Sequence, residues 1–176
     1  MKAILMSIRP QWVAKILNGE KTVEIRKTAP NVKVPIDVYI YCTKGKYEMG
    51  KFNSDKKYHE IRDDCCYAGG WSRGLPDETI NGKVVAKFTL NKVEEIKDKW
   101  FSQDICETDE LSCVELERKS CLYSYDIHKY LKDKTGYAWH IDNLEIFDNP
   151  RPLQPYFDLN RPPQSWQYIW ENDLCH

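Results

Sequence analysis

The apolar residues of this 176-residue chain come in short runs, and residues 38–42 (VYIYC) form one of the longest. A membrane-spanning helix needs roughly 20 consecutive apolar residues, so this pattern excludes a transmembrane protein. Runs rich in Val, Ile and Tyr that end at turn residues instead predict short β-strands. The chain length predicts a single domain over residues 1–176, whose core is large enough to fold without a disulfide or a metal.

The pattern of apolar residues places strands toward both ends of the chain. The expected strands are residues 2–8, 21–27, 36–42, 83–96 (bent or divided near Asn91), 137–148 and 165–170, and the expected helices are 10–18, 108–117 and 124–132. Pro10 and Gly19 stand where a helix begins and ends. Residues 43–81 show weak periodicity and predict a long loop, whereas 101–134 predicts a helical insertion.

The cysteines and histidines show no regular metal-binding pattern. Seven cysteines lie at positions 42, 65, 66, 106, 113, 121 and 175. Their odd number, without a Cys-x-x-Cys pair or a secretory signal, predicts free thiols and a cytoplasmic protein. The four histidines lack metal-ligand spacing, and His140 is expected to be a hydrogen-bonded strand residue. We therefore expect neither a metal nor a cofactor.

The net charge of −1 conceals a gradient along the chain. Residues 1–60 carry a net charge of +6, residues 61–100 carry 0 and residues 101–176 carry −7. A basic first third can attract phosphate groups, while the acidic last third limits non-specific association. The charge pattern therefore favours a nucleic-acid or nucleotide partner only in general terms. The common phosphate-loop, dinucleotide, zinc-protease and serine-hydrolase motifs are all absent from the sequence.

The segment with the most chemical information is NGEKTVEIR, residues 18–26, directly after the expected first helix. Lys21 and Arg26 are suited to phosphate, the arginine through a bidentate fork and the lysine as a point charge. Glu24 could accept a hydrogen bond from a base edge or take a proton. It could equally be the ion-pair partner that holds both cations, so the residues alone leave a binding site and a structural ion-pair ladder open.

The same segment matches a family pattern. Gly-x-Lys-x-x-Glu-x-Arg is formed by Gly19, Lys21, Glu24 and Arg26, and in this the chain resembles the ASCH family of the PUA-like superfamily. The segments SIRPQWVAKILNG, YAWHIDNLEIFDNPRPL and PPQSWQYI are also similar to those of small bacterial and phage-type members. The resemblance covers residues 1–42, 82–100 and 136–170. It implies an α+β, PUA-like mixed β-barrel with a short helix beside a cleft, and RNA as the usual ligand.

We therefore expect the protein to bind RNA or a nucleotide in a cleft between residues 10–18 and residues 21–27. Aromatic side chains would contribute because bases stack on their rings. The residues expected to bind the ligand are Gly19, Lys21, Glu24, Arg26, Trp12, Tyr41, Gln164, Ser165 and Trp166. The sequence does not identify the ligand or the oligomeric state.

Two alternatives remain open, and the first is a hydrolase that uses Lys21 and Glu24. The resemblance includes acetylcytidine amidohydrolases with a Lys, a Thr three residues later and a distant Glu; here Glu24 stands in the Thr position, and Glu94 and Glu95 lie in the region of the distant Glu. It also includes ribonucleases, in which a Lys–Glu pair could serve as electrophile and general base. Because strand residues three apart point to opposite faces, such a pair requires Lys21 to precede the strand, which a bend at Gly19 permits.

The second alternative is a protein-interaction module that acts through the acidic insertion at residues 101–134. The sequence does not decide whether the protein is an enzyme.

Overall fold

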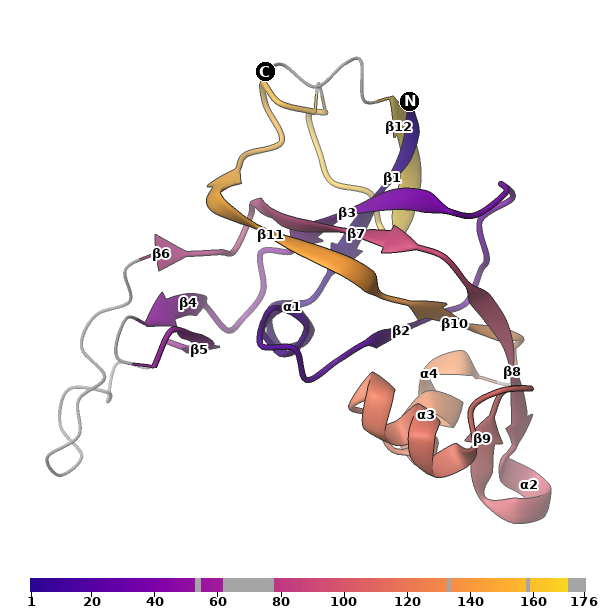
Figure 1. Ribbon diagram of the computed structural model, residues 1–176. Helices are drawn as coiled ribbons and strands as arrows, with labels where there is room; N and C mark the ends of the chain where they lie inside the picture. Colours follow the sequence, from indigo (N-terminus) through magenta and orange to yellow (C-terminus); the bar gives the residue numbers. More distant parts are fainter. Residues whose placement is uncertain (53–54, 62–77, 133, 158, 171–176) are drawn as a thin grey trace, which may run out of the picture. The chain divides into compact units, whose positions relative to one another are not determined.

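The computed structural model describes residues 1–52, 55–61, 78–132, 134–157 and 159–170, which form short helices and three β-sheets (Figure 1). The strands are β1 (Lys2–Ile8), β2 (Val23–Arg26), β3 (Ile36–Cys42), β4 (Met49–Phe52), β5 (Lys57–Glu60), β6 (Glu78–Thr79), β7 (Val84–Leu90), β8 (Val93–Lys99), β9 (Ile105–Glu107), β10 (Gly136–His140), β11 (Asp142–Arg151) and β12 (Trp166–Trp170). The helices are α1 (Pro10–Leu17), α2 (Trp100–Gln103), α3 (Cys113–Ser120) and α4 (Ser124–Leu131).

The chain divides into two compact units. The first unit contains residues 1–18, 37–88 and 144–176, and the second contains residues 19–36 and 89–143. Each unit has its own cluster of buried apolar side chains. None of the helices within the described residues combines the length and the apolar character needed to cross a bilayer.

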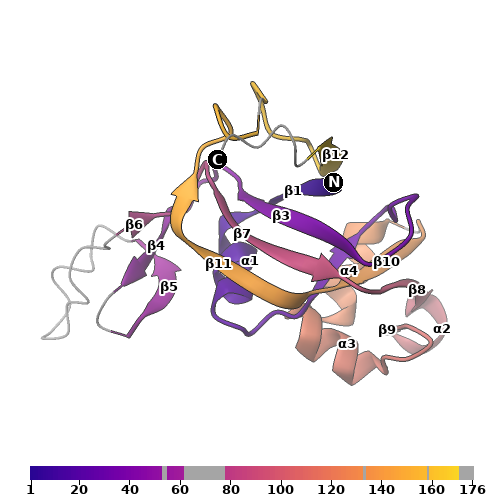
Figure 2. The same ribbon diagram turned by 45° about the horizontal axis from the view of Figure 1, so that its top comes forward.

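The first unit contains a mixed five-stranded sheet with the order β11-β7-β3-β1-β12. Figure 2 shows β1, β3, β7 and β11 following one another across it. β1 runs parallel to β3 and antiparallel to β12, and α1 lies in the connection that makes the parallel pair possible. One face of the sheet supplies a core cluster that includes Leu5, Tyr39 and Ile169.

The segment expected to be a long loop, residues 43–81, also contains the small sheet β5-β4-β6. These strands have only two to four residues, too few to produce a visible alternation in the sequence. Side chains from outside the small sheet hold it in place. The Asn18 side chain bonds both the N–H and the C=O of Tyr58, at 2.9 and 3.0 Å, and Asn81 Oδ1 accepts from the Met49 N–H at 2.9 Å. Residues 62–77 lie outside the described part.

The second unit packs helices α3 and α4 against one face of the sheet β2-β10-β8-β9 (Figure 1). Val23, Ile25 and Ala138 on that face contact a cluster that includes Leu116 and Leu131. Helix α3 begins later than the predicted 108–117 because Ser112 and Glu115 form a capping box at its N-terminus. The cysteines at positions 42, 106, 113 and 121 are free thiols, as predicted.

Three of the predicted strands differ in extent from those observed. The expected strand at 83–96 is two strands, β7 and β8, and the expected strand at 137–148 is also two, β10 and β11. Strand β2 begins only at Val23 because the two residues before it are bound to the end of α3. This local difference determines where Lys21 points.

Candidate functional site

The motif segment turns sharply before strand β2. Gly19 has a φ of 75°, in the left-handed region that glycine adopts without strain. The Thr22 N–H then donates to the Lys119 carbonyl at 2.8 Å, so the chain lies against the C-terminal end of α3 before it enters the sheet. Lys21 is therefore outside the strand, as a Lys21–Glu24 pair requires.

The Lys21 ammonium bonds two groups from different elements. Its Nζ lies 2.6 Å from the carbonyl oxygen of Ser120, the last residue of α3, and 3.3 Å from the Glu24 carboxylate. Carbonyls in the last turn of a helix have no partner within the helix, and they carry partial negative charge. Lys21 therefore caps α3 and pairs with Glu24 at the same time.

Glu24 and Arg26 are two residues apart on β2 and share one face of the sheet. The guanidinium lies 3.1 Å from the second carboxylate oxygen of Glu24, so one carboxylate receives both cations of the motif. Trp139 and Tyr137 are the partners of these two residues on β10 and lie on the same face. Trp139 is fully buried, and its Nε1 donates to the Thr28 carbonyl at 3.2 Å.

All three charged side chains of this motif trio are buried. Lys21 is 2% exposed, Arg26 7% and Glu24 8%. Electrostatic attraction is stronger in such surroundings than in water, but each charge also loses its hydration. The trio can orient an ammonium and a guanidinium rigidly about one carboxylate, which suits the recognition of an anion or the transfer of a proton.

The other residues predicted to bind ligand belong to the first unit. Ser165 and Tyr41 both adjoin Ser7 of β1. The Ser7 N–H donates to the Ser165 carbonyl at 2.9 Å, and Ser7 is paired with Tyr41 of the neighbouring strand β3. Ser7 is a buried polar residue that the sequence did not single out. Tyr41 is itself buried, and burial, with a smaller effect of Cys42, raises its pKa.

The remaining predicted residues are scattered over the first unit. Gln164 is exposed, while Trp12 on α1 and Trp166 on β12 are half-buried. Trp166 makes an edge-on contact with Tyr168, with ring centroids 5.4 Å apart. The structure thus gathers Lys21, Glu24 and Arg26 in one unit and Tyr41 and Ser165 around Ser7 in the other.

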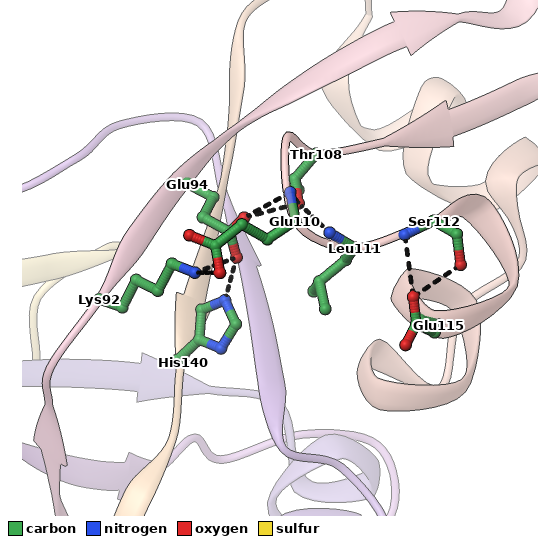
Figure 3. A network of polar contacts seen from close by, with 8 residues as sticks. All are labelled: Lys92, Glu94, Thr108, Glu110, Leu111, Ser112, Glu115 and His140. Atoms are coloured by element: carbon green, nitrogen blue, oxygen red, sulfur yellow. Dashed lines mark hydrogen bonds and ion pairs between the residues drawn. The ribbon is translucent and has the colours of Figure 1, made fainter.

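A second polar cluster, not predicted from the sequence, surrounds Glu94 in the second unit (Figure 3). We call Lys92, Glu94, Thr108, Glu110 and His140 the Glu94 cluster. Glu94 Oε1 accepts from Thr108 Oγ1 at 2.8 Å and from the Glu110 N–H at 3.2 Å. The other carboxylate oxygen contacts His140 Nε2 and lies 3.6 Å from Lys92 Nζ. The contact of His140 confirms that it is a hydrogen-bonded strand residue.

The environment of Glu94 acts on its ionisation in two directions. Burial of the carboxyl favours the neutral form, but hydrogen bonds from Thr108 and His140, with the charges of His140 and Lys92, outweigh it. The pKa of Glu94 is therefore lowered, and the carboxylate is the stable form at neutral pH. The cluster is a set of satisfied polar groups around one anion.

The strand register separates the Glu94 cluster from the motif trio. Ala138 pairs with Glu94 on one side and with Ile25 on the other, so these three share a face. Glu24 is on the opposite face. The exposed Glu95 lies on the motif face instead, two strands away from Arg26. Of the two glutamates singled out from the sequence, the register therefore brings Glu95 to the motif face and Glu94 to the helix-packed face.

The sequence contained a weak signal for the Glu94 cluster. Its members come from positions 92, 94, 108, 110 and 140, which are two close pairs and one distant residue, so no single motif spans the cluster. Strand alternation puts Glu94 on the same face of β8 as the apolar Ile96, and a glutamate in that position could have been noticed because it requires partners when buried. Among the described residues, no three His, Cys, Asp or Glu side chains gather to hold a metal ion.

Comparisons with known proteins agree with the architecture. A family model for the ASCH domain matches residues 6–149. The crystal structure of an ASCH protein from Zymomonas mobilis superposes with a TM-score of 0.59 at 15% identity, covering 97% of this chain and 90% of that one. A variant of the same protein with a tyrosine replaced by phenylalanine gives a TM-score of 0.59 at 15% identity, covering 98% of this chain and 94% of that one. A variant with a serine replaced by alanine gives a TM-score of 0.58 at 14% identity, covering 97% of this chain and 90% of that one. A search of curated proteins finds no match.

Proposed function

Because the chain belongs to the ASCH domain family, whose members share an α+β, PUA-like fold and are generally RNA-binding, we propose that it binds RNA or a nucleotide through the motif trio. The family assignment supports RNA as the class of partner. The role of Lys21, Glu24 and Arg26 in this chain rests on their geometry.

The observation that carries the proposal is the convergence of Lys21 and Arg26 on one carboxylate. Glu24 orients both cations, one from a turn and one from a strand, at 3.3 and 3.1 Å. A preorganised guanidinium can bind phosphate oxygens in a bidentate manner, and little side-chain freedom is lost on binding. The basic first third of the chain, with its net charge of +6, adds a general attraction for a polyanion.

The test is the binding of short single-stranded RNA at several salt concentrations. Affinity should fall steeply with salt because the neutralisation of phosphates releases counterions. Arg26→Lys keeps the charge but loses the fork, and we expect it to weaken binding by about tenfold, the loss of one charge-assisted contact. The matched control is Arg118→Lys at an exposed position of α3, which should leave affinity unchanged.

Equal affinities for wild type, Arg26→Lys and Arg118→Lys would contradict a role for the motif in binding. A salt-independent affinity would contradict phosphate recognition altogether. Circular dichroism of each variant separates a loss of binding from a loss of fold.

A second candidate function is hydrolysis of RNA or of an acetylated cytidine, and the Lys21–Glu24 contact favours it. Lys21 lies before the strand and its ammonium is within 3.3 Å of the carboxylate, so the two groups could act together on one proton. Lys21→Met retains the length of the side chain without the ammonium. It should abolish turnover of N4-acetylcytidine or of single-stranded RNA, and turnover equal to that of wild type would exclude this role for the lysine.

A further inference from the structure

The first unit contains a cavity at the end of β11 and in the segment that follows, and none of the motif residues is in its lining. Its volume is about 540 Å³, and residues 145–152 and Tyr156 line it. Pockets for small molecules usually have volumes of roughly 300 to 1,000 Å³. Strand β11 is an edge strand of the five-stranded sheet, next to β7 (Figure 2).

The guanidinium of Arg151 is stacked on aromatic rings in this cavity. Its central carbon lies 4.8 Å from the ring centre of Phe147 and 5.7 Å from that of Tyr156. Both rings pack against the core cluster of the first unit, and Phe147 also contacts Tyr39, with centroids 6.3 Å apart. Rings anchored in this way hold the guanidinium in one orientation before a ligand arrives.

The N–H donors of Arg151 have no hydrogen-bond partner among the described residues. Throughout the described part of the chain, the two rings are the only partners of this guanidinium, and it pairs with no carboxylate. An arginine stacked on rings presents its N–H groups in the plane of the guanidinium, where they match two oxygens of a phosphate. The half-buried position of the side chain strengthens such a contact.

Two acidic residues also line the cavity, and they restrict what can bind. Glu145 is engaged with Lys87, whose Nζ lies 3.4 Å from the carboxylate. Asp148 is exposed at the cavity and offers oxygen acceptors. A ligand with negative charge alone would be repelled by Asp148, whereas one that also carries hydroxyl groups could donate hydrogen bonds to it.

We propose that this cavity binds a phosphorylated ribose, with the phosphate on Arg151 and a ribose hydroxyl on Asp148. The ligand is either a free nucleotide or the phosphorylated end of an RNA, since both present the same chemistry. The proposal goes beyond RNA binding by the motif trio and is independent of it, because its residues are different and all belong to the first unit.

The test is calorimetric titration of the full chain with adenosine 5′-monophosphate, adenosine and inorganic phosphate. The monophosphate should bind at least about tenfold more tightly than adenosine or phosphate, because only it satisfies both Arg151 and Asp148. Arg151→Lys should weaken its binding by about tenfold, since the lysine has no planar fork. Arg161→Lys, at an exposed position of the same unit, is the matched control and should bind as wild type does.

A second comparison tests the hydroxyl contact. Wild type should bind adenosine monophosphate more tightly than its 2′,3′-dideoxy analogue, and Asp148→Ala should remove that preference.

A pair of short oligoribonucleotides, with and without a 5′-phosphate, distinguishes a free nucleotide from an RNA end as the ligand. If the 5′-phosphate increases the affinity of the oligonucleotide and Arg151→Lys removes this increase, the ligand is an RNA end. If the mononucleotide binds but the 5′-phosphate does not increase the affinity of the oligonucleotide, the ligand is a free nucleotide.

The proposal is overturned if neither the mononucleotide nor the phosphorylated oligonucleotide binds at millimolar concentration, or if Arg151→Lys and Arg161→Lys bind equally. Failure of RNA binding by the motif would appear instead as an unchanged affinity in Arg26→Lys. The two results are therefore distinguishable.

Discussion

Two buried glutamates in the second unit, Glu24 and Glu94, lie on opposite faces of one sheet and are stabilised in different ways. Glu24 receives a lysine and an arginine and pairs with Trp139 across the strands. Glu94 receives a hydroxyl, a backbone N–H, an imidazole and a lysine that is about one-third exposed. Both are 8% exposed, so burial is not what separates them.

The two sites differ in the groups that lose a partner when the carboxylate is removed. Without Glu24, two buried cations lose their shared counter-charge, and neither has easy access to water. Two of the partners of Glu94, the Thr108 hydroxyl and the Glu110 N–H, are neutral donors, and Lys92 is a cation that solvent can reach. The trio is thus a set of mutually dependent charges, whereas the Glu94 cluster is mainly a set of hydrogen bonds.

The largest effect should come from Glu24→Gln. Because the substitution leaves Lys21 and Arg26 buried beside a neutral amide, we expect it to lower the free energy of unfolding by about 3–5 kcal/mol. Urea denaturation at pH 7 measures the change. Glu95→Gln, an exposed residue on the same face, is the control and should change stability by no more than about 0.5 kcal/mol. A loss as small as that of the control would mean that the trio is not an interdependent set of charges.

A smaller loss should follow Glu94→Gln. The amide can keep one acceptor for Thr108 but loses the charge that attracts Lys92, so we expect a loss of about 1–3 kcal/mol. The same denaturation experiment measures it, again with Glu95→Gln as the control. A loss larger than that of Glu24→Gln would reverse the comparison between the two sites.

The stability difference between wild type and Glu94→Gln should depend on pH. The pKa of Glu94 is lowered in the folded state, so its carboxylate stabilises the fold above the unfolded pKa of about 4.3. This contribution is lost as pH falls through the folded pKa. Denaturation at a series of pH values from about 7 down to 3 should therefore show the difference shrink in acid; a difference constant over that range would contradict the lowered pKa.

The smallest effect expected in the Glu94 cluster is that of Thr108→Val. The hydroxyl donates to Glu94 at 2.8 Å and accepts from the Leu111 N–H at 2.8 Å. Valine has the same shape but cannot form either bond, and we expect a loss of about 1–2 kcal/mol. Thermal unfolding followed by circular dichroism measures it. The double variant with Glu94→Gln should lose less stability than the sum of the losses in the two single variants, because the two residues share one hydrogen bond.

The sequence predicted the features that arise from short stretches of chain. Strands β1, β3 and β12, helix α1 and the break near Asn91 follow from local apolar patterns and from Pro10 and Gly19. The trio was visible because its three members lie within six residues, in a segment whose family pattern is recognisable. The ASCH assignment and the α+β class were therefore within reach of the sequence.

Contacts between distant parts of the chain were decided only by the tertiary structure. Lys21 meets Ser120, which is 99 residues away, and this contact keeps the lysine out of the strand and brings it to Glu24. The Glu94 cluster and the stacked Arg151 likewise depend on side chains that a turn or a strand register brings together. Local propensity determines which residues form an element and which face they occupy, but packing and register determine which polar groups meet, because each buried group must find its partner wherever the fold places one.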